Sequence, residues 1–123
     1  MDAGHNSSQL ELMAEQVILV DEKDQQIGAE SKSASHYHQG SLHRAFSVLV
    51  FDSSGRILLQ KRSKDKITFP GVWANACCSH PLDVEGERDG FTGSINAAIR
   101  KMEQELGVLS KTLNAEDFQP LTK

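Results

Sequence analysis

Two apolar runs joined by a short polar turn constrain the fold more than any other part of this sequence. Residues 45–51 and 56–61 are rich in aliphatic and aromatic side chains, and they flank Asp52-Ser-Ser-Gly55. Aspartate, serine and glycine at such a reversal favour a tight turn between two antiparallel strands. Gln16–Val20 and residues 27–31, separated by an acidic turn, predict a second pair of strands. Hairpins are therefore expected in the first half of the chain.

A single helix is predicted after these strands. Ser94 can cap its first turn, Gly107 can end it, and apolar residues recur between them at helical spacing. Residues 33–41 predict a histidine-bearing loop, residues 68–81 a proline-bounded functional loop, and residues 82–93 an exposed connection. Several strands with one isolated helix favour an α+β sandwich. The apolar helix positions are Ile95, Ala98, Ile99, Met102 and Leu106.

Length and composition limit the functions that this chain can have. Its 123 residues suffice for at most one small domain. The formal net charge of -4 gives no reason to expect nucleic acid as a partner, so a phosphate-bearing ligand needs a local basic site. No run approaches the length of a membrane span, and no signal peptide is evident. The only cysteines, Cys77 and Cys78, are adjacent, which disfavours a disulfide and predicts a reducing compartment.

Three histidines are candidate metal ligands. His36 and His43 lie seven residues apart before a predicted strand, and His80 lies in the proline-bounded loop. Imidazole commonly binds divalent transition metals, and a set of loops and strands can bring distant residues together. By spacing alone His38 is as good a candidate as His36. The alternative is that all of them are scattered surface residues.

Other residues with chemical potential lie near these histidines in the sequence. Cys78 precedes His80 by two positions and could be a nucleophile or an acid/base, or else a buried structural thiol, the role expected of Cys77. Glu105, near the end of the predicted helix, could hold Mg²⁺ with phosphate oxygens, or simply pair with Lys101 four residues earlier. A basic set suited to a diphosphate, or to a solvated turn, consists of Lys61, Arg62, Lys64 and Lys66.

The sequence resembles type I isopentenyl-diphosphate Δ-isomerases, members of the Nudix superfamily, in five motifs that occur in the same order. They are Leu42-His-Arg-Ala-Phe-Ser47, Leu59-Gln-Lys-Arg-Ser63, Thr68-Phe-Pro-Gly-Val-Trp-Ala-Asn75, Cys77-Cys-Ser-His-Pro81 and Glu105-Leu-Gly-Val108. The Cys-Ser-His-Pro loop after Phe-Pro-Gly is specific to that enzyme. The Leu-His-Arg-Ala-Phe-Ser and Cys-Cys-Ser-His-Pro motifs look closest to those of eukaryotic members. The resemblance runs from about residue 15 to residue 108.

This resemblance implies a Nudix-type α/β/α sandwich with a mixed sheet. Residues 1–15 would be an N-terminal extension, and residues 16–123 the N-terminal part of a single domain that is incomplete at its C-terminus. The generic Nudix hydrolase motif has Arg-Glu followed two residues later by paired glutamates. Here Lys101 follows Arg100, and Gln104 replaces the first of the pair, leaving Glu105. Two missing carboxylates favour an isomerase over a hydrolase.

The resemblance also implies an activity, the conversion of isopentenyl diphosphate to dimethylallyl diphosphate by a metal-dependent 1,3-allylic proton shift in isoprenoid biosynthesis. Cys78 would be one of two proton-transferring residues, and Glu105 would help to hold Mg²⁺ on the diphosphate. A second divalent metal (Mn²⁺, Zn²⁺ or Mg²⁺) would bind His36, His43 and His80, with His36 preferred over His38. The residues that would grip the diphosphate are Lys32, Arg62, Lys66 and Ser79.

The family's remaining site residues would fall beyond residue 123: two metal-binding glutamates, one of which pairs with Cys78 in proton transfer, a tyrosine and a cation-facing tryptophan. The chain is therefore expected to be an inactive fragment of the isomerase or one completed by another chain. The alternatives are a non-catalytic remnant that binds metal or diphosphate, and a Nudix hydrolase. An uncovered sheet edge and helix face predict self-association. The expected location is the cytoplasm, with the peroxisome, known for some eukaryotic members, as the alternative.

Overall fold

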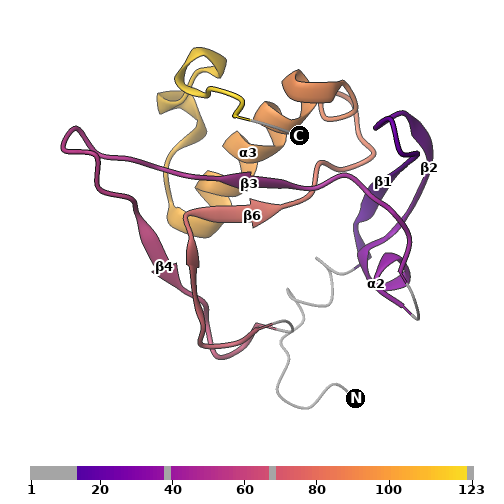
Figure 1. The fold of residues 1–123 in the computed structure, drawn as a ribbon, viewed down its shortest axis with the longest axis horizontal. Coiled ribbons are helices and arrows are strands. Elements are labelled where there is room, and N and C mark those ends of the chain that lie inside the picture. The colour runs from indigo at the N-terminus through magenta and orange to yellow at the C-terminus, as the bar shows by residue number, and fades with distance from the viewer. Residues whose placement is uncertain (1–13, 38–39, 67–68, 122–123) are drawn as a thin grey trace.

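A computed structural model describes residues 14–37, 40–66 and 69–121 of the chain (Figure 1). Its first element is the antiparallel pair β1 (Gln16–Val20) and β2 (Gln26–Ser31), joined by an acidic turn. Asp21 stabilises that turn, because its Oδ1 atom accepts hydrogen bonds from the N–H groups of Lys23 and Gln25, each at 2.9 Å. The predicted pair of strands at residues 16–20 and 27–31 is confirmed.

The predicted hairpin at residues 45–61 is present, but its two arms pair with each other only near the turn. At the turn Gly55 N–H donates to Asp52 O, and beyond it Leu58 N–H donates to Val50 O. Farther from the turn, β3 (Phe46–Val48) pairs with β6 (Cys77–Ser79), and β4 (Leu59–Lys61) pairs with β5 (Trp73–Asn75). The expectation of a loop over residues 68–81 is thus wrong for residues 73–79. Pairing with the hairpin arms, rather than any local pattern, makes these residues strands.

The helix α3 (Gly90–Leu106) begins four residues before the predicted cap at Ser94. Asp89 is the N-cap instead. The earlier start was missed because the two glycines of the first turn are typical of a loop. The predicted end is confirmed: Gly107 has a left-handed φ of 71°, and its N–H donates to Glu103 O. Two short 3₁₀ helices follow, η1 (Ser110–Thr112) and η2 (Ala115–Asp117), and both contact α3.

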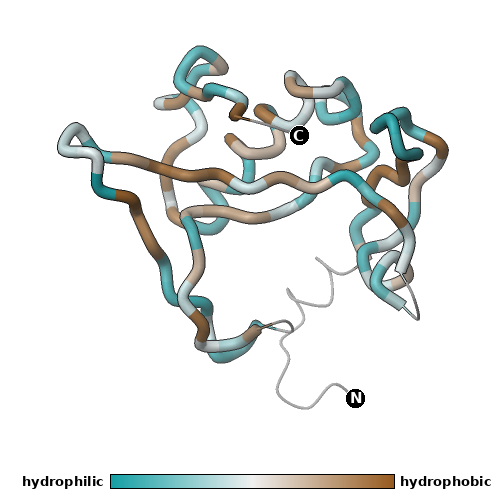
Figure 2. Tube along the Cα trace, in the orientation of Figure 1, coloured by the Kyte–Doolittle hydropathy of each residue, from teal (hydrophilic) through white to brown (hydrophobic). Residues whose placement is uncertain are grey.

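One face of the β3–β6 pair is covered by α3, and among the described residues no helix covers the other face, here called the open face (Figure 1). The described strand pairings are all antiparallel, and with the long helix they confirm the α+β class. Along β3 and β4 the tube in Figure 2 carries several hydrophobic residues, many of them exposed. No helix in the described part of the chain is long and apolar enough to cross a membrane. The buried apolar residues are Val17, Ile18, Val20, Ala76, Cys77, Leu82, Ala97, Ala98 and Met102.

Replacement of Gly93 by alanine is expected to destabilise the fold. A methyl group there would lie too close to the backbone carbonyl of Glu87, in the loop on which the first turn of α3 packs. This clash outweighs the gain of about 1 kcal/mol in helix propensity and leaves a net loss of about 1–2 kcal/mol. Urea unfolding of Gly93→Ala and of the control Thr92→Ala, an exposed neighbour, measures the difference. A Gly93→Ala variant as stable as the unmodified chain would contradict this packing.

Candidate functional site

The second edge of β1 places two of the candidate metal ligands. On that edge Val20 N–H donates to Leu42 O at 3.1 Å and Arg44 N–H donates to Ile18 O at 2.9 Å, so His43 lies opposite Leu19. Farther along the same edge, Val17 pairs with Leu82, two residues after His80. A single strand therefore brings together two segments that are 37 positions apart in the sequence.

His36 comes from the other side of β1. Residues 33–41 were expected to be a loop, but Lys32–Ser35 form the short helix α2, and His36 is its C-cap. The Ser31 hydroxyl caps the start of this helix by accepting a hydrogen bond from Ala34 N–H at 3.2 Å. Ser31 itself pairs with Gln16 of β1, so β1 fixes this segment too. His38, the alternative to His36, lies outside the described residues.

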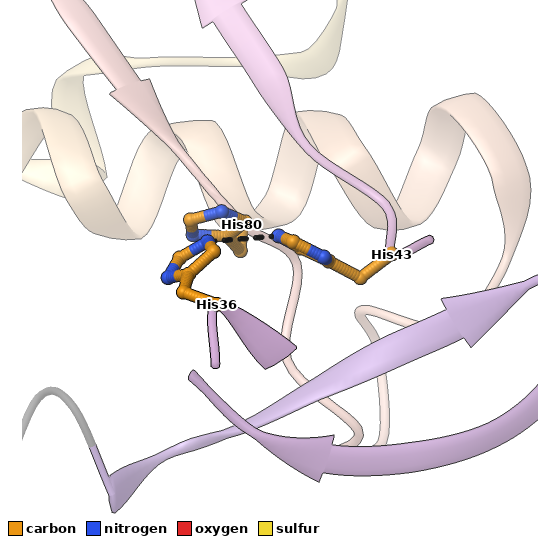
Figure 3. A group of neighbouring side chains, drawn as sticks. All are labelled: His36, His43 and His80. Atoms are coloured by element: carbon orange, nitrogen blue, oxygen red, sulfur yellow. Dashed lines mark hydrogen bonds between the residues drawn. The ribbon is translucent and has the colours of Figure 1, made fainter. Parts of the chain in front are cut away.

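His36, His43 and His80 converge (Figure 3). One ring nitrogen from each lies within 4.8 Å of the others, and the Nε2 atoms of His36 and His43 are 3.2 Å apart. Two nitrogens that each lie about 2.1 Å from one tetrahedral ion are separated by about 3.4 Å. The separation of the His36 and His43 nitrogens is close to this value, so the three imidazoles, here called the histidine triad, are a candidate site for a divalent metal ion.

The tautomer of His43 is set by its backbone neighbour. Its Nδ1 atom lies 2.6 Å from Ser41 O, and because a carbonyl can only accept, Nδ1 carries the proton. In the neutral ring Nε2 then presents its lone pair towards His36 and His80. A ligating histidine commonly has its second nitrogen oriented in this way.

Burial keeps two of the imidazoles neutral near pH 7. Burial, followed by the ammonium of Lys32 and the neighbouring rings, lowers the pKa of His80 to about 4. Burial also lowers the pKa of His36, followed by the effects of His43 and Lys32. An unprotonated ring is the form that binds metal, so the triad is prepared for a cation although lysines lie nearby.

Three lysines and two glutamates form an ion-pair group beside the triad. Lys32 is buried and its Nζ lies 3.1 Å from Glu15 Oε1. Glu105 is shared, because its Oε1 lies 3.4 Å from Lys66 Nζ and 3.5 Å from Lys101 Nζ. Burial alone would raise the pKa of Glu105, but these two ammonium groups outweigh it and hold that pKa below its ordinary value. Glu105 is thus a carboxylate in a cationic environment.

Lys101 was not assigned a site role from the sequence. Its side chain is only 3% exposed, and burial lowers its pKa although Glu105 opposes the effect. Lys101 also contributes to the lowered pKa of His80. Its position four residues after Ala97 and eight after Gly93, both buried small residues of α3, is the sequence signal that would have found it.

Cys78 lies on the open face of β6, in a strand rather than in the predicted loop. Its thiol donates to Asn75 Oδ1 at 2.8 Å, and its Sγ atom lies 3.4 Å from Ser47 Oγ. The Asn75 side chain is fixed in turn, because its Nδ2 donates to Val48 O at 3.1 Å. Alternation along the strand buries Cys77 on the opposite face.

The two remaining predicted substrate-binding residues are Ser79 and Arg62. Ser79 is buried and points to the face of β6 opposite Cys78. Arg62 follows β4, where its backbone N–H donates to Val72 O at 2.8 Å. The structure thus brings the histidine triad and the lysines into one region and leaves the Cys78 thiol on the open face of the sheet.

An ion pair that the sequence analysis did not assign holds the segment after His80. The Glu87 carboxylate is paired with Arg100 through two hydrogen bonds of 2.8 and 3.0 Å and also accepts Leu82 N–H at 2.9 Å. Burial would raise the pKa of Glu87, but the Arg100 guanidinium and the Leu82 amide outweigh it and lower that pKa. Arg100 also donates to His80 O at 3.4 Å, so residues 80–82 are held from two sides.

Comparison with known proteins identifies the family. The NUDIX domain matches residues 41–122, which is well over half of the chain. The chain belongs to the Nudix domain family. The Nudix match includes β3 to α3, with His43, His80 and Cys78, whereas β1, β2 and α2 precede it. The strand that organises the triad and the segment that carries His36 and Lys32 therefore lie N-terminal to the matched region.

Named relatives are similar to this Nudix chain over nearly all of its length. It is 45% identical to isopentenyl-diphosphate delta-isomerase idi1 of Aspergillus fumigatus, over 98% of the chain and 47% of that protein. It is 45% identical to isopentenyl-diphosphate delta-isomerase of Schizosaccharomyces pombe, over 97% of the chain and 56% of that protein. It is 46% identical to isopentenyl-diphosphate Delta-isomerase 1 of Bos taurus, over 94% of the chain and 53% of that protein. The chain spans about half the length of the curated relatives it matches.

The two adjacent cysteines are expected to differ in reactivity. Burial, together with the Glu105 carboxylate, raises the pKa of the Cys77 thiol to about 11, so at pH 8 almost no reactive thiolate is present. Cys78 is exposed. Iodoacetamide on the folded chain should label Cys78 and leave Cys77 unmodified, as measured by mass spectrometry of the digest.

The Cys78→Ser variant is the matched control for this labelling. It should take up no label when folded and one label in denaturant. Equal labelling of both cysteines in the folded chain would show that the alternation of β6 is wrong.

Proposed function

We propose that this chain carries part of the active site of an isomerase that converts isopentenyl diphosphate to dimethylallyl diphosphate. The observation that carries the proposal is the convergence of His36, His43 and His80 beside buried lysines. A metal site next to a cationic region suits a substrate with a diphosphate group. The similarity to proteins named isopentenyl-diphosphate isomerases supports the same substrate.

In this proposal the ion-pair group binds the diphosphate. Lys32, Lys66 and Lys101 contribute three positive charges against the two negative charges of Glu15 and Glu105. An incoming diphosphate would balance the excess charge and give the buried ammonium groups a further partner. Arg62 and Ser79 are the other proposed contacts to the diphosphate.

Two metal sites are proposed, with different donors. The histidine triad would hold Mn²⁺, Zn²⁺ or Mg²⁺, and its all-nitrogen donor set favours the transition metals. Glu105 offers a single carboxylate, which is insufficient for Mg²⁺ alone but sufficient together with phosphate oxygens and water. Such an ion would supply positive charge that holds the diphosphate.

Cys78 is the proposed proton-transferring residue. Moving the double bond requires a proton to be added at one end of the allylic unit and another to be removed from the other end. The Cys78 thiol faces the open side of the sheet, and Asn75 fixes the direction of its hydrogen. Protonation of the alkene gives a carbocation-like state, so water must be excluded from that face during the reaction.

Hydrolysis of a diphosphate is disfavoured by the same geometry. A Nudix hydrolase needs carboxylates that hold metal ions and activate water. Here Lys101 and Gln104 occupy two of those positions, and Glu105 is the single carboxylate that remains of the set.

An isomerase assay tests the proposal. The purified chain is incubated with isopentenyl diphosphate, Mg²⁺ and Mn²⁺, and dimethylallyl diphosphate is measured. Turnover should fall roughly 100-fold or more in Cys78→Ala, because a positioned acid or base contributes at least that factor. The neighbouring Cys77→Ala is the control and should retain activity. Turnover that survives in Cys78→Ala would contradict the assignment of Cys78.

The alternative function predicts a different result in the same experiment. A non-catalytic metal- and diphosphate-binding chain would show no turnover and would still bind inorganic pyrophosphate in calorimetry. That pattern would restrict the chain to binding.

Self-association through exposed apolar side chains of the β3–β4 hairpin and β5 is also proposed. Phe51 is 57% exposed and Trp73 63% exposed, with Leu49 and Leu59 also exposed on these segments. Exposed apolar surface that is not covered within one chain is a candidate for contact with a second copy, which offers an equivalent surface. Light scattering should therefore give twice the monomer mass.

The Phe51→Ser variant should shift the chain towards the monomer. Ile27→Ser, which removes an exposed side chain from β2, should not. A monomeric unmodified chain at micromolar concentration would refute the interface.

The cytoplasm is the proposed location, with the peroxisome as the alternative. Two free cysteines suit a reducing compartment. Location varies among similar proteins, since two Arabidopsis thaliana relatives are named as chloroplastic.

A further inference from the structure

The guanidinium of Arg44 is buried and joins three segments of the chain. The side chain is 8% exposed. Its Nε donates to Asp24 Oδ1 and its Nη2 to Asp24 O, both at 2.8 Å, and its Nη1 donates to Arg88 O at 2.7 Å. Asp24 is in the β1–β2 turn with a positive φ of 61°, and Arg88 is in the loop before α3. Arg44 itself follows His43.

These contacts fix the backbone that carries His43. Residues 42–44 run along the second edge of β1, so the side chains of His43 and Arg44 point to opposite sides of that segment. Anchoring the Arg44 side chain at two separate points prevents this segment from rotating or sliding on β1. The position of the His43 imidazole on the other side is determined by the same restraint.

The contact with Arg88 O extends the restraint towards His80. The loop that contains Arg88 starts at Asp83, whose N–H donates to Gln16 O of β1 at 3.0 Å. Arg44 thus ties the segment of His43 to the loop that follows His80. A lysine could not make the same contacts, because one ammonium cannot reach two fixed acceptor groups as a planar fork does.

We propose that Arg44 is a positioning residue for the histidine triad and sets the relative placement of the His43 and His80 imidazoles. This inference rests on the proposed metal site, although Arg44 itself contacts none of the three rings in the described contacts. Groups that orient metal ligands typically change metal affinity by 10- to 100-fold when they are replaced.

A cobalt titration tests the inference without any enzymatic assay. Co²⁺ binding to the purified chain is followed by its visible absorption, which reports both affinity and coordination geometry. The Arg44→Lys variant should bind Co²⁺ about 10-fold more weakly and with an altered spectrum. The matched control is Arg88→Lys, which removes a guanidinium from an exposed ion pair with Asp83 and keeps the Arg88 carbonyl. The control should bind Co²⁺ as the unmodified chain does.

The outcomes separate the two proposals. No Co²⁺ binding by the unmodified chain, or equal binding by His80→Ala, would refute the metal site itself. Unchanged Co²⁺ affinity and spectrum in a folded Arg44→Lys, with only a lower melting temperature, would overturn the positioning role and leave a stabilising contact. If Arg44→Lys does not fold, Asp24→Asn, which retains the guanidinium and weakens one contact, should bind Co²⁺ two- to threefold more weakly. Unchanged binding there would equally overturn the inference.

Discussion

The hydrogen bonds on the second edge of β1 are the interaction on which the rest of this structure depends. β2 occupies one edge of that strand, and the other edge is divided between residues 42–44 and residues 82–83. Backbone pairing of this kind fixes register as well as distance, because each residue has a defined partner. The segments that carry the three ligands are therefore aligned by their pairing with β1 and β2. The strand that achieves this lies N-terminal to the region matched by the NUDIX domain.

The electrostatics of the site have one consistent direction. Buried ammonium groups lie beside the triad, and together with burial they keep His36 and His80 unprotonated. Protonated imidazoles would add charge to a region that is already cationic. Neutral imidazoles instead leave room for a metal ion, whose charge a diphosphate can balance. The burial of the histidines and the nearby lysines thus both favour binding of a metal ion together with a diphosphate.

Local chemistry predicted the features that are determined locally. The turn at Asp52 to Gly55 and the helix end at Gly107 follow from residues within a few positions, and the structure has both. The strands β5 and β6 were missed because they form by pairing with the arms of the hairpin. The early start of α3 was missed because the close packing of Gly93 on the Glu87 backbone is not visible in the sequence. Residue types alone indicated a histidine site, but the choice of His36 over His38 needed the family resemblance. The helical spacing of Lys101 from Gly93 and Ala97 was an available signal for its burial. No sequence pattern indicates the contacts of Arg44, since they depend on segments that are distant in the chain.

Because β6 contains two adjacent cysteines, a one-residue shift in its register against β3 would affect the exposed thiol and the metal ligands differently. If β6 shifted by one residue against β3, Cys77 would take the outward position of Cys78, and a thiol would still face the open side. The same shift would carry His80 about 3.3 Å along the strand direction, away from its two partners. Such a shift would keep a thiol on the open face but would separate the three histidines. Metal binding would therefore distinguish a correctly paired chain from a slipped one that has the same number of accessible thiols.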